Sequence, residues 1–539
     1  MQDGNVRDAL RAAWSSCDRV VMVMAVGAAV RLIAPLLDDK RRDPGVVCVD
    51  DATRFAVALT GGHEGGANAL AEHIAAYLRA TAVVTTASDA FDVPTLVDVG
   101  AAFGVRTERD GDLAAVGGAL VSGAPVNLLR EVAWPLGPLP GVTEVDAPAA
   151  PLLLVTDRVV DPPRPCVVYR PPSLVVGVGA SRGVTADEVG DLIDATLAAA
   201  GLSSLSVACV ATVDAKADEA GIIEAAVTRG WPLVTLPAGV LATIAVPHPS
   251  AVVAAAVGTP SVAEAAALHR GGDLLVAKRK STRATVAVAR RAPRGHLALV
   301  SLGPGDPELV PARARRALAR AEVVVGYTAY LDLARPLLPR GAATEPSPLG
   351  DEVARARRAL DLARQGRSVA LVSSGDVGVY AMAAPTIESS AGDGAEAPVD
   401  VEIVPGVTAA QAAASLLGAP LGHDHCAISL SDLLTPWRDI RRRLRAAAAG
   451  DFVVALYNPR SATRDWQLDE ARRILLAHRS PDTPVGVVRD AYRTASSVQV
   501  TTLAALDPAT VDMRTVVLVG STRTRMAGRW MLTPRGATT

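Results

Sequence analysis

Short apolar runs alternate with longer amphipathic stretches along most of the 539-residue chain. Near the N-terminus the runs are RVVMVMAV, GVVCVDD, FAVAL and ATAVVTTASD, and stretches such as GANALAEHIAAYLRA lie between them. Uninterrupted apolar runs of this length predict strands that are buried on both faces, and the stretches between them predict helices. The pattern therefore predicts a multidomain α/β protein, and the length favours three or four domains.

The spacing of these patterns divides the chain into regions. We expect four, which are residues 1–105, 106–172, 173–291 and 296–539. The second is rich in Gly and Pro and is expected to be a small subdomain followed by a linker. The third opens with the strand, glycine turn and helix of SLVVGVGASRGVTADEVGDLIDATLAAAG, in which Thr185 is the expected N-cap and Glu188 completes a capping box. The basic stretch RRAPRG is the expected linker to the last region.

One segment, Val20–Leu37, is apolar apart from Arg31. A central arginine is costly in a bilayer, and the uninterrupted part is short for a membrane span. The preceding residues include Asp3, Asp8 and Asp18, whereas a signal peptide would begin with a basic stretch. We therefore expect a buried strand at Val20–Met24, then a glycine turn and a helix.

The composition narrows the class of protein. Hydrophobic residues make up 50% and charged residues 20%, which is typical of a globular protein and excludes a disordered one. The net charge of -2 gives no reason to expect a nucleic-acid partner. The five cysteines are far apart and odd in number, so neither a disulfide framework nor a zinc site is expected, and a reducing cytoplasm fits. His423 and His425 lack a third ligand, so no resident metal is expected.

The last region opens with a glycine loop, SLGPGDPELV, directly after the apolar run HLALV. It lacks the Lys-Ser/Thr ending of a phosphate loop, and it contains Asp306, which would repel a phosphate. Alone it could be a tight turn. Three further strand ends, in VALVSSGDVGVYAMA, VEIVPGVTAAQAAA and FVVALYNPRS, have loops of a similar kind. Four such loops favour one ligand cleft at the carboxyl edge of a sheet.

Ordered blocks in residues 296–539 resemble the tetrapyrrole methylases, the S-adenosylmethionine-dependent enzymes of cobalamin and sirohaem synthesis. The blocks include GPGDPEL, VVGYTAYLDL, VSSGDVGVYAMA, SLSDLLTPW, LYNPRS and MLTPRG, and they are most similar to the C17-methylating members that act on precorrin-3B. The resemblance implies a C-terminal two-lobed α/β methylase fold, a tetrapyrrole substrate and a homodimer formed through this region. It implies S-adenosyl-L-methionine contacts from Gly303, Pro304, Gly305, Asp306, Ser373, Gly375, Asp376, Val377, Tyr380, Thr408, Ala409, Tyr457 and Asn458.

The chemistry of that cofactor agrees with the loops. It has a sulfonium cation, an ammonium and a ribose diol but no phosphate, so acidic loops suit it. Methyl transfer needs mainly positioning, whereas the ring contraction that the family couples to it involves proton shifts and general acid–base groups. The candidates are His423, Asp424, Ser429, Ser431 and Asp432, although Asp424 or Asp432 could equally cap a helix and His423 could be a buried structural histidine. One or two arginines of WRDIRRRLR or GSTRTRMAGRW are expected to bind substrate carboxylates.

The first three regions resemble cobalt-precorrin-5A hydrolases. The blocks VMAVGAAVRLIAPLL, GGHEGGAN, GVGASRG, VATVDAKADEAG and VGTPSVAEAAAL occur in the same order. The resemblance implies opening of a ring A lactone with release of acetaldehyde. The candidates for activating water are His63 and Glu64, with Asn68 and Lys216 as polar contacts. A half that only binds or hands on the tetrapyrrole is the alternative. For the methylase half, the alternatives are a metal-free and a cobalt-containing substrate.

Overall fold

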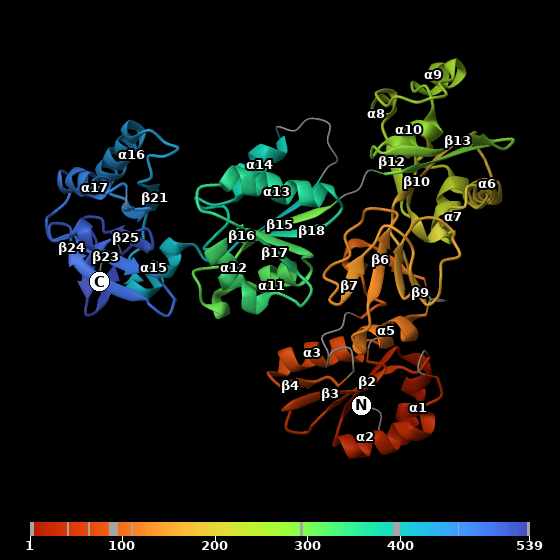
Figure 1. Ribbon diagram of the computed structural model, residues 1–539, viewed down its shortest axis with the longest axis horizontal. Helices are drawn as coiled ribbons and strands as arrows, with labels where there is room; N and C mark the ends of the chain where they lie inside the picture. Colours follow the sequence, from red (N-terminus) through yellow and green to blue (C-terminus); the bar gives the residue numbers. More distant parts are fainter. Residues whose placement is uncertain are drawn as a thin grey trace. The chain divides into compact units, whose positions relative to one another are not determined.

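The computed structural model forms two compact units (Figure 1). Unit 1 comprises Met1–Glu131 and Leu139–Pro171, and unit 2 comprises Val132–Pro138 and Pro172–Thr539. The residues that the structure describes are 5–39, 42–62, 65–85, 95–108, 112–291, 295–391, 399–461 and 463–535. Within these ranges every helix is too short or too polar to cross a bilayer. The predicted linker falls partly outside the described residues, at 292–294.

Unit 1 begins with a four-stranded sheet of order β1-β2-β3-β4. Its elements are α1 (Val6–Ser16), β1 (Arg19–Val23), α2 (Val26–Ile33), β2 (Gly45–Val49), β3 (Phe55–Thr60), α3 (Ala67–Leu78) and β4 (Thr81–Val83). The predicted strand and helix in the apolar N-terminal segment are present as β1 and α2, although Gly27 lies inside the helix rather than in a turn before it. The expectation of a buried strand is right for only one face of β1, because Val21 and Val23 are exposed. One face of the sheet packs on α1 and α2, and α3 covers part of the other.

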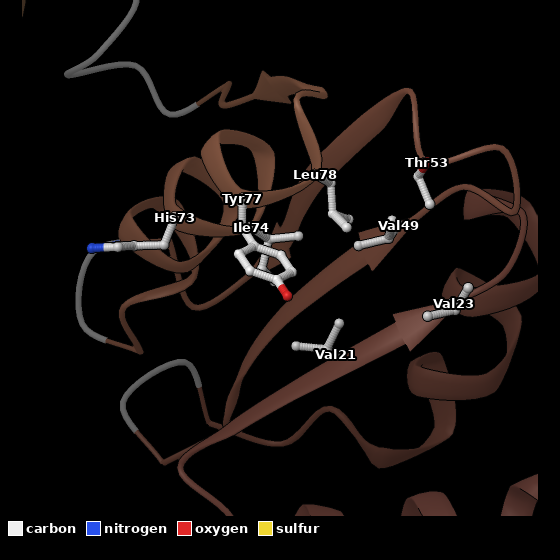
Figure 2. Close-up of a pocket in the computed structure, with 8 residues that line it drawn as sticks. All are labelled: Val21, Val23, Val49, Thr53, His73, Ile74, Tyr77 and Leu78. Atoms are coloured by element: carbon white, nitrogen blue, oxygen red, sulfur yellow. The ribbon is translucent and has the colours of Figure 1, made fainter. Parts of the chain in front are cut away.

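Because α3 packs on β2, β3 and β4, it leaves one face of the edge strand β1 uncovered. Val21 and Val23 point to that face and are 47% and 62% exposed. Together with side chains of α3 they line an open apolar hollow of about 530 Å³ (Figure 2).

The rest of unit 1 is a five-stranded sheet of order β5-β9-β8-β6-β7. Its elements are β5 (Arg106–Thr107), α5 (Leu113–Val121), β6 (Val126–Arg130), β7 (Val142–Glu144), β8 (Leu152–Val155) and β9 (Cys166–Arg170). The expectation of a linker at the end of this region is wrong, since β9 is a fully buried interior strand. The prolines on both sides of β9 concealed its apolar run, because proline is typical of linkers as well as of strand boundaries.

Unit 2 starts with a sheet of order β12-β11-β10-β14-β13. Its elements are β10 (Leu174–Ala180), α6 (Ala186–Ala199), β11 (Val207–Val213), α7 (Ala220–Thr228), β12 (Leu233–Leu236), α8 (Ala238–Ala242), α9 (Ala251–Val257), α10 (Val262–Leu268), β13 (Asp273–Lys280) and β14 (Ala284–Arg290). Thr185 caps α6 as predicted, because its side chain accepts the Glu188 N–H at 3.3 Å. The capping-box prediction is only half right, since the Glu188 carboxylate accepts from Ser281 and Arg283 instead.

The first lobe of the C-terminal region is a fully parallel sheet of order β17-β16-β18-β15-β19. Its elements are β15 (His296–Ser301), α11 (Ala312–Ala319), β16 (Val323–Tyr327), α12 (Thr328–Ala334), β17 (Ala343–Ser347), α13 (Glu352–Arg364), β18 (Ser368–Ser373), α14 (Ala383–Ala391) and β19 (Asp400–Val404). Separate apolar clusters cover its two faces, as the uninterrupted apolar runs predict. The parallel register brings the carboxyl ends of β15, β18 and β19 together.

The second lobe has a mixed sheet of order β21-β22-β25-β23-β24 and a small one of order β20-β27-β26. Its elements are α15 (Ala409–Leu417), β20 (Gly418–Ala419), β21 (His425–Ser429), α16 (Trp437–Ala449), β22 (Val453–Tyr457), α17 (Gln467–Leu476), β23 (Pro484–Arg489), β24 (Ser497–Thr502), β25 (Thr515–Val519), β26 (Arg525–Ala527) and β27 (Trp530–Leu532). In the larger sheet β21 and β22 pair in parallel, so their carboxyl ends lie side by side, whereas the other neighbouring strands pair antiparallel.

A short segment, Val132–Pro138, is part of unit 2 although its neighbours in the chain belong to unit 1. The Leu136 N–H donates to the buried Glu322 carboxylate at 2.9 Å, and the same carboxylate accepts from Arg367 at 3.2 Å and from the Ser368 N–H at 3.3 Å. Trp134 is 3% exposed, and the Arg291 guanidinium lies 4.5 Å from its ring centre. This segment is therefore anchored on the first lobe of the C-terminal region.

Candidate active site

Two glycine loops pair with each other at the carboxyl ends of β15 and β18. The Gly303 N–H donates to the Gly375 carbonyl at 3.1 Å, and the Gly375 N–H donates to the Gly303 carbonyl at 2.7 Å. Both residues have positive φ angles, 66° and 71°, which favour glycine. A Cβ on Gly375 would lie 3.9 Å from the Ala409 N and from the Thr408 Cα, so this loop lies at ordinary contact distance from the start of α15.

The Ser301 hydroxyl connects the same loops to β19. It donates to the Val404 carbonyl at 2.7 Å and accepts from the Val377 N–H at 2.8 Å. A Cβ on Gly406 would lie 2.4 Å from the Ser301 Cβ, so only glycine fits at this junction. The sequence predicts the loop that contains Ser301 but does not single out its hydroxyl or Gly406, because the contacts join segments about a hundred residues apart.

The carboxylates of the two aspartates in these loops accept hydrogen bonds from backbone N–H groups. Asp376 accepts from the Gly378 N–H and from the Gly406 N–H, both at 2.8 Å. Asp306 accepts from the Glu308 N–H at 2.8 Å and caps the short 3₁₀ turn Pro307–Leu309. Of the two roles that the sequence leaves open for Asp306, the geometry supports shaping of the turn.

Tyr457, at the end of β22, joins that strand to the start of α15 within the second lobe. Its hydroxyl lies 2.7 Å from the Thr408 hydroxyl and accepts from the Ala410 N–H at 2.9 Å. Burial raises the pKa of this phenol above its ordinary value, so it stays neutral at physiological pH. Thr408 is the N-cap residue of α15, although its side chain makes no capping hydrogen bond. The Tyr380 ring lies 5.2 Å from that of Tyr457.

Part of the predicted acid–base group gathers at the carboxyl ends of β21 and β22. Ser429 accepts from the Asn458 side chain at 3.0 Å and from the Ser431 N–H at 3.2 Å. Asp432 accepts from Gln467 at 3.0 Å, and the Arg464 guanidinium lies 3.9 Å away. Asn458 has a φ of 49°, a strained conformation that is common at functional sites. Asn458 directly follows Tyr457 in the chain, and Ser429 pairs with Tyr457 in the sheet, so these two groups lie beside Tyr457.

His423 and Asp424 lie elsewhere. They precede β21, so the strand separates them from Ser429, and five residues of strand span about 17 Å. Their side chains are 3.4 Å apart, and both are exposed or partly so. The structure therefore does not bring this pair together with Ser431 and Asp432.

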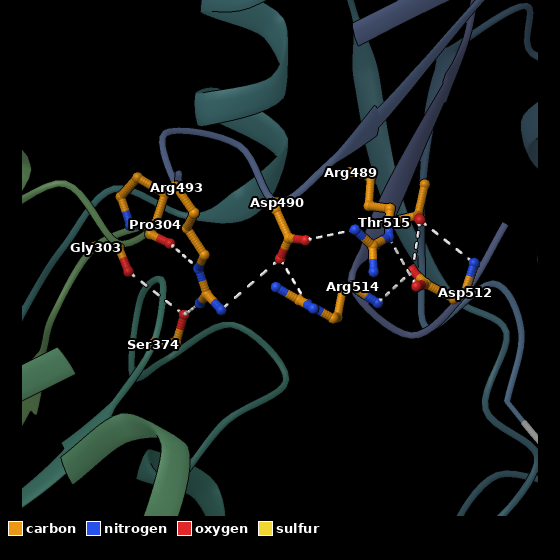
Figure 3. Close-up of polar contacts among 9 residues, drawn as sticks. All are labelled: Gly303, Pro304, Ser374, Arg489, Asp490, Arg493, Asp512, Arg514 and Thr515. Carbon is orange, nitrogen blue, oxygen red and sulfur yellow. Dashed lines mark hydrogen bonds and ion pairs between the residues drawn. The ribbon is translucent and has the colours of Figure 1, made fainter. Parts of the chain in front are cut away.

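Arg493 is a site residue that the sequence does not reveal. It lies in the turn between β23 and β24, yet its guanidinium donates to the Pro304 carbonyl at 2.7 Å and to the Ser374 hydroxyl at 3.0 Å (Figure 3). It therefore touches both glycine loops from the second lobe. Arg493 and Pro304 are 189 positions apart in the chain, so no local sequence pattern predicts their contact.

Family models match the chain in four consecutive segments. The cobalamin synthesis G N-terminal, central and C-terminal regions match residues 8–89, 95–171 and 174–289, and the tetrapyrrole (corrin/porphyrin) methylases match residues 296–507. A probable cobalt-factor III C(17)-methyltransferase of Salmonella typhimurium is 43% identical over 242 residues, which is 45% of this chain and 99% of that protein. The chain belongs to the tetrapyrrole methylase family.

Two further relatives show the same C-terminal likeness. A cobalt-factor III methyltransferase of Priestia megaterium is 44% identical over 45% of each chain, and the cobalamin biosynthesis protein CobIJ of Mycobacterium tuberculosis is 50% identical over 43% of this chain and 45% of that protein. This tetrapyrrole methylase thus spans less than half the length of the first curated relatives it matches. The crystal structure of the methyltransferase CobJ is 42% identical, covers 44% of this chain and 100% of that chain, and has a TM-score of 0.43.

In the cobalamin synthesis G regions, the structure describes two of the four predicted site residues. Asn68 is 8% exposed and lies in the first turn of α3. The Lys216 ammonium lies 3.3 Å from the Glu219 carboxylate, which also accepts from the Gly183 N–H at 2.7 Å. Burial opposes ionisation of Glu219, but these two partners outweigh it and lower its pKa. His63 and Glu64 lie outside the described residues.

Proposed function

We propose that the C-terminal region transfers a methyl group from S-adenosylmethionine to C17 of a precorrin-3B-type tetrapyrrole and promotes contraction of the macrocycle. The main support is the pairing of the Gly303 and Gly375 loops at the carboxyl ends of β15 and β18, next to the start of α15. Similarity to C(17)-methyltransferases adds to it.

The residues present fit the cofactor. Carbonyls of Gly303 and Gly375 and hydroxyls of Ser373, Thr408 and Tyr457 are hydrogen-bonding groups suited to an ammonium and a ribose, and Asp376 supplies negative charge for a cation. When bound, the cofactor supplies an electrophilic methyl group. The loops would hold it by most of the groups named in the prediction: Gly303, Pro304, Ser373, Gly375, Asp376, Val377, Tyr380, Thr408, Ala409, Tyr457 and Asn458. Gly305 and Asp306, also named there, shape the first loop.

In the methyl-transfer step, the residues of the chain have mainly to position the cofactor and the substrate, and proton transfer is less important. The neutral Tyr457 holds the start of α15 against β22 and so fixes the wall of the site. Ring contraction requires proton movement, and Ser431 and Asp432 are the acid–base candidates that share a strand edge with Tyr457. His423 and Asp424 remain candidates at a separate location.

Methyl transfer from labelled S-adenosylmethionine to precorrin-3B and, in parallel, to cobalt-factor III tests the proposal. Transfer to the first substrate supports the metal-free reaction, and transfer only to the second assigns the cobalt-containing one. No transfer to either substrate by the purified chain contradicts the methyltransferase proposal.

We further propose that the three N-terminal regions open the ring A lactone of cobalt-precorrin-5A with release of acetaldehyde. The matched cobalamin synthesis G segments, in order and nearly continuous, support this. Acetaldehyde measured after addition of that substrate is the test. Binding of the substrate without acetaldehyde would favour the alternative, a half that binds the tetrapyrrole and hands it on.

Homodimerisation through residues 296–539 is also proposed, from the resemblance alone. Light scattering on the purified chain should give twice the mass of 55.3 kDa. The monomer mass would contradict it.

A further inference from the structure

Arg493 reaches across the C-terminal region from the second lobe to the first. Its Nε donates to the Pro304 carbonyl at 2.7 Å and its Nη2 donates to the Ser374 hydroxyl at 3.0 Å. Pro304 belongs to the loop after β15 and Ser374 to the loop after β18. One planar group therefore bonds to both of the loops that pair through Gly303 and Gly375 (Figure 3).

The first loop is shaped to admit this side chain. A Cβ on Gly305 would lie 2.6 Å from the Arg493 Cγ and 2.9 Å from its Nε. Gly305 also has a φ of 142°, which side chains rarely adopt. The second glycine of GPG is thus explained by the arginine stem that packs on it, rather than by a ligand.

The Arg493 guanidinium also lies near a buried carboxylate, that of Asp490. The Asp490 side chain is 1% exposed; Arg514 donates to it at 2.7 Å and Arg489 lies 2.9 Å from it. Arg493 lies 3.9 Å from the same carboxylate. Arg489 also bonds to Asp512 at 2.8 Å, within the second lobe. Of the arginines around Asp490 in Figure 3, Arg493 is the one drawn with bonds to the glycine loops.

We propose that Arg493 is a positioning residue that sets the spacing of the two glycine loops from the second lobe and thereby determines cofactor affinity. The inference rests on the proposed function, because these loops are the proposed cofactor site. The fork of a guanidinium can bond to two loops at fixed geometry, and a lysine ammonium cannot reproduce that geometry. Loop order before binding reduces the entropic cost of binding.

The test compares Arg493→Lys and Arg493→Met with Arg514→Lys in the full chain. Arg514→Lys disturbs the same carboxylate without touching a glycine loop, so it is the matched control. S-adenosylhomocysteine affinity is measured by calorimetry, and amide hydrogen exchange of residues 301–306 and 373–378 is measured without ligand. Both Arg493 variants should bind about tenfold more weakly, as the loss of charged hydrogen bonds implies, and both loops should exchange faster.

Two results would overturn the proposal. One is wild-type exchange in both loops of the Arg493 variants. The other is an equal change in Arg514→Lys, which would indicate general loosening around Asp490. Arg493→Met keeps an apolar stem against Gly305, so a loss of affinity in this variant results from the missing guanidinium donors. If the wild-type chain does not bind S-adenosylhomocysteine, the cofactor proposal fails, while the exchange measurements still decide the role of Arg493.

Discussion

At the scale of single residues, the Tyr457 hydroxyl is the most informative group of the site. It bonds to Thr408 and to the Ala410 N–H, so it joins a strand end to a helix start. Tyr457→Phe leaves that N–H without its acceptor, and we expect affinity for S-adenosylhomocysteine to fall about tenfold in calorimetry. Tyr492→Phe is the control, since its hydroxyl contacts Ser415 at a distance of 2.9 Å in the same lobe. Unchanged affinity in Tyr457→Phe would remove Tyr457 from the site.

The same phenol predicts a pH dependence of stability. Burial raises the pKa of Tyr457 from its ordinary 10.0, so the phenol stays protonated in the folded state where the unfolded chain ionises. Its contribution is therefore complete below about pH 10 and is lost as the pH rises through the folded value. Urea unfolding between pH 9 and 11 should show a smaller loss of stability in Tyr457→Phe than in the wild type. Parallel curves would contradict this assignment.

Individual residues also show where sequence reasoning stops. An acid after a glycine turn suits a cationic ligand and caps a helical turn equally well, so Asp306 could not be assigned before its bond to the Glu308 N–H was known. His423 and Asp424 lie close to Ser431 in the chain, yet a strand lies between them. Arg493 needs contacts with residues far away in the sequence, which a one-dimensional pattern does not contain.

At the scale of elements, the predicted strand–loop–helix order of the C-terminal region is confirmed, because apolar runs and glycine turns are local signals. The edge where β15, β18 and β19 end follows from the parallel register. The buried strand β9 was missed, since its flanking prolines resemble a linker. The hairpin of β13 and β14 completes a sheet whose other strands are parallel, and no local signal fixes that arrangement.

The close packing where these strands end predicts that adding one methyl group at Gly406 lowers stability. In Gly406→Ala the new Cβ would lie 2.4 Å from the Ser301 Cβ and 2.7 Å from the Gly375 carbonyl. The loops must move apart, at a cost of about 1–3 kcal/mol in unfolding free energy, and S-adenosylhomocysteine affinity should fall with it. Gly239→Ala is the control, because its Cβ would meet nothing within 4 Å. Equal stability of both variants in urea unfolding would show that the junction yields easily.

At the scale of the whole molecule, Glu322 is the anchor of the segment Val132–Pro138 in unit 2. Its carboxylate accepts from Leu136, Arg367 and Ser368. Glu322→Ala leaves buried donors without an acceptor, and we expect a loss of about 2–3 kcal/mol in the urea-unfolding transition of unit 2. Glu388→Ala, at an exposed position of α14, should leave the transition unchanged. If the two variants unfold alike, the segment contributes nothing to the stability of unit 2.

The placement of Val132–Pro138 has a practical consequence for anyone who wishes to study one proposed activity at a time. The chain enters unit 2, returns to unit 1 at Leu139 and enters unit 2 again at Pro172. A gene divided at any one codon therefore leaves at least one unit incomplete. A fragment that starts at His296 lacks Trp134 and Leu136, and its Glu322 loses the Leu136 N–H. Inactivating one half by point substitutions in the intact chain is the better way to test the two proposed reactions separately.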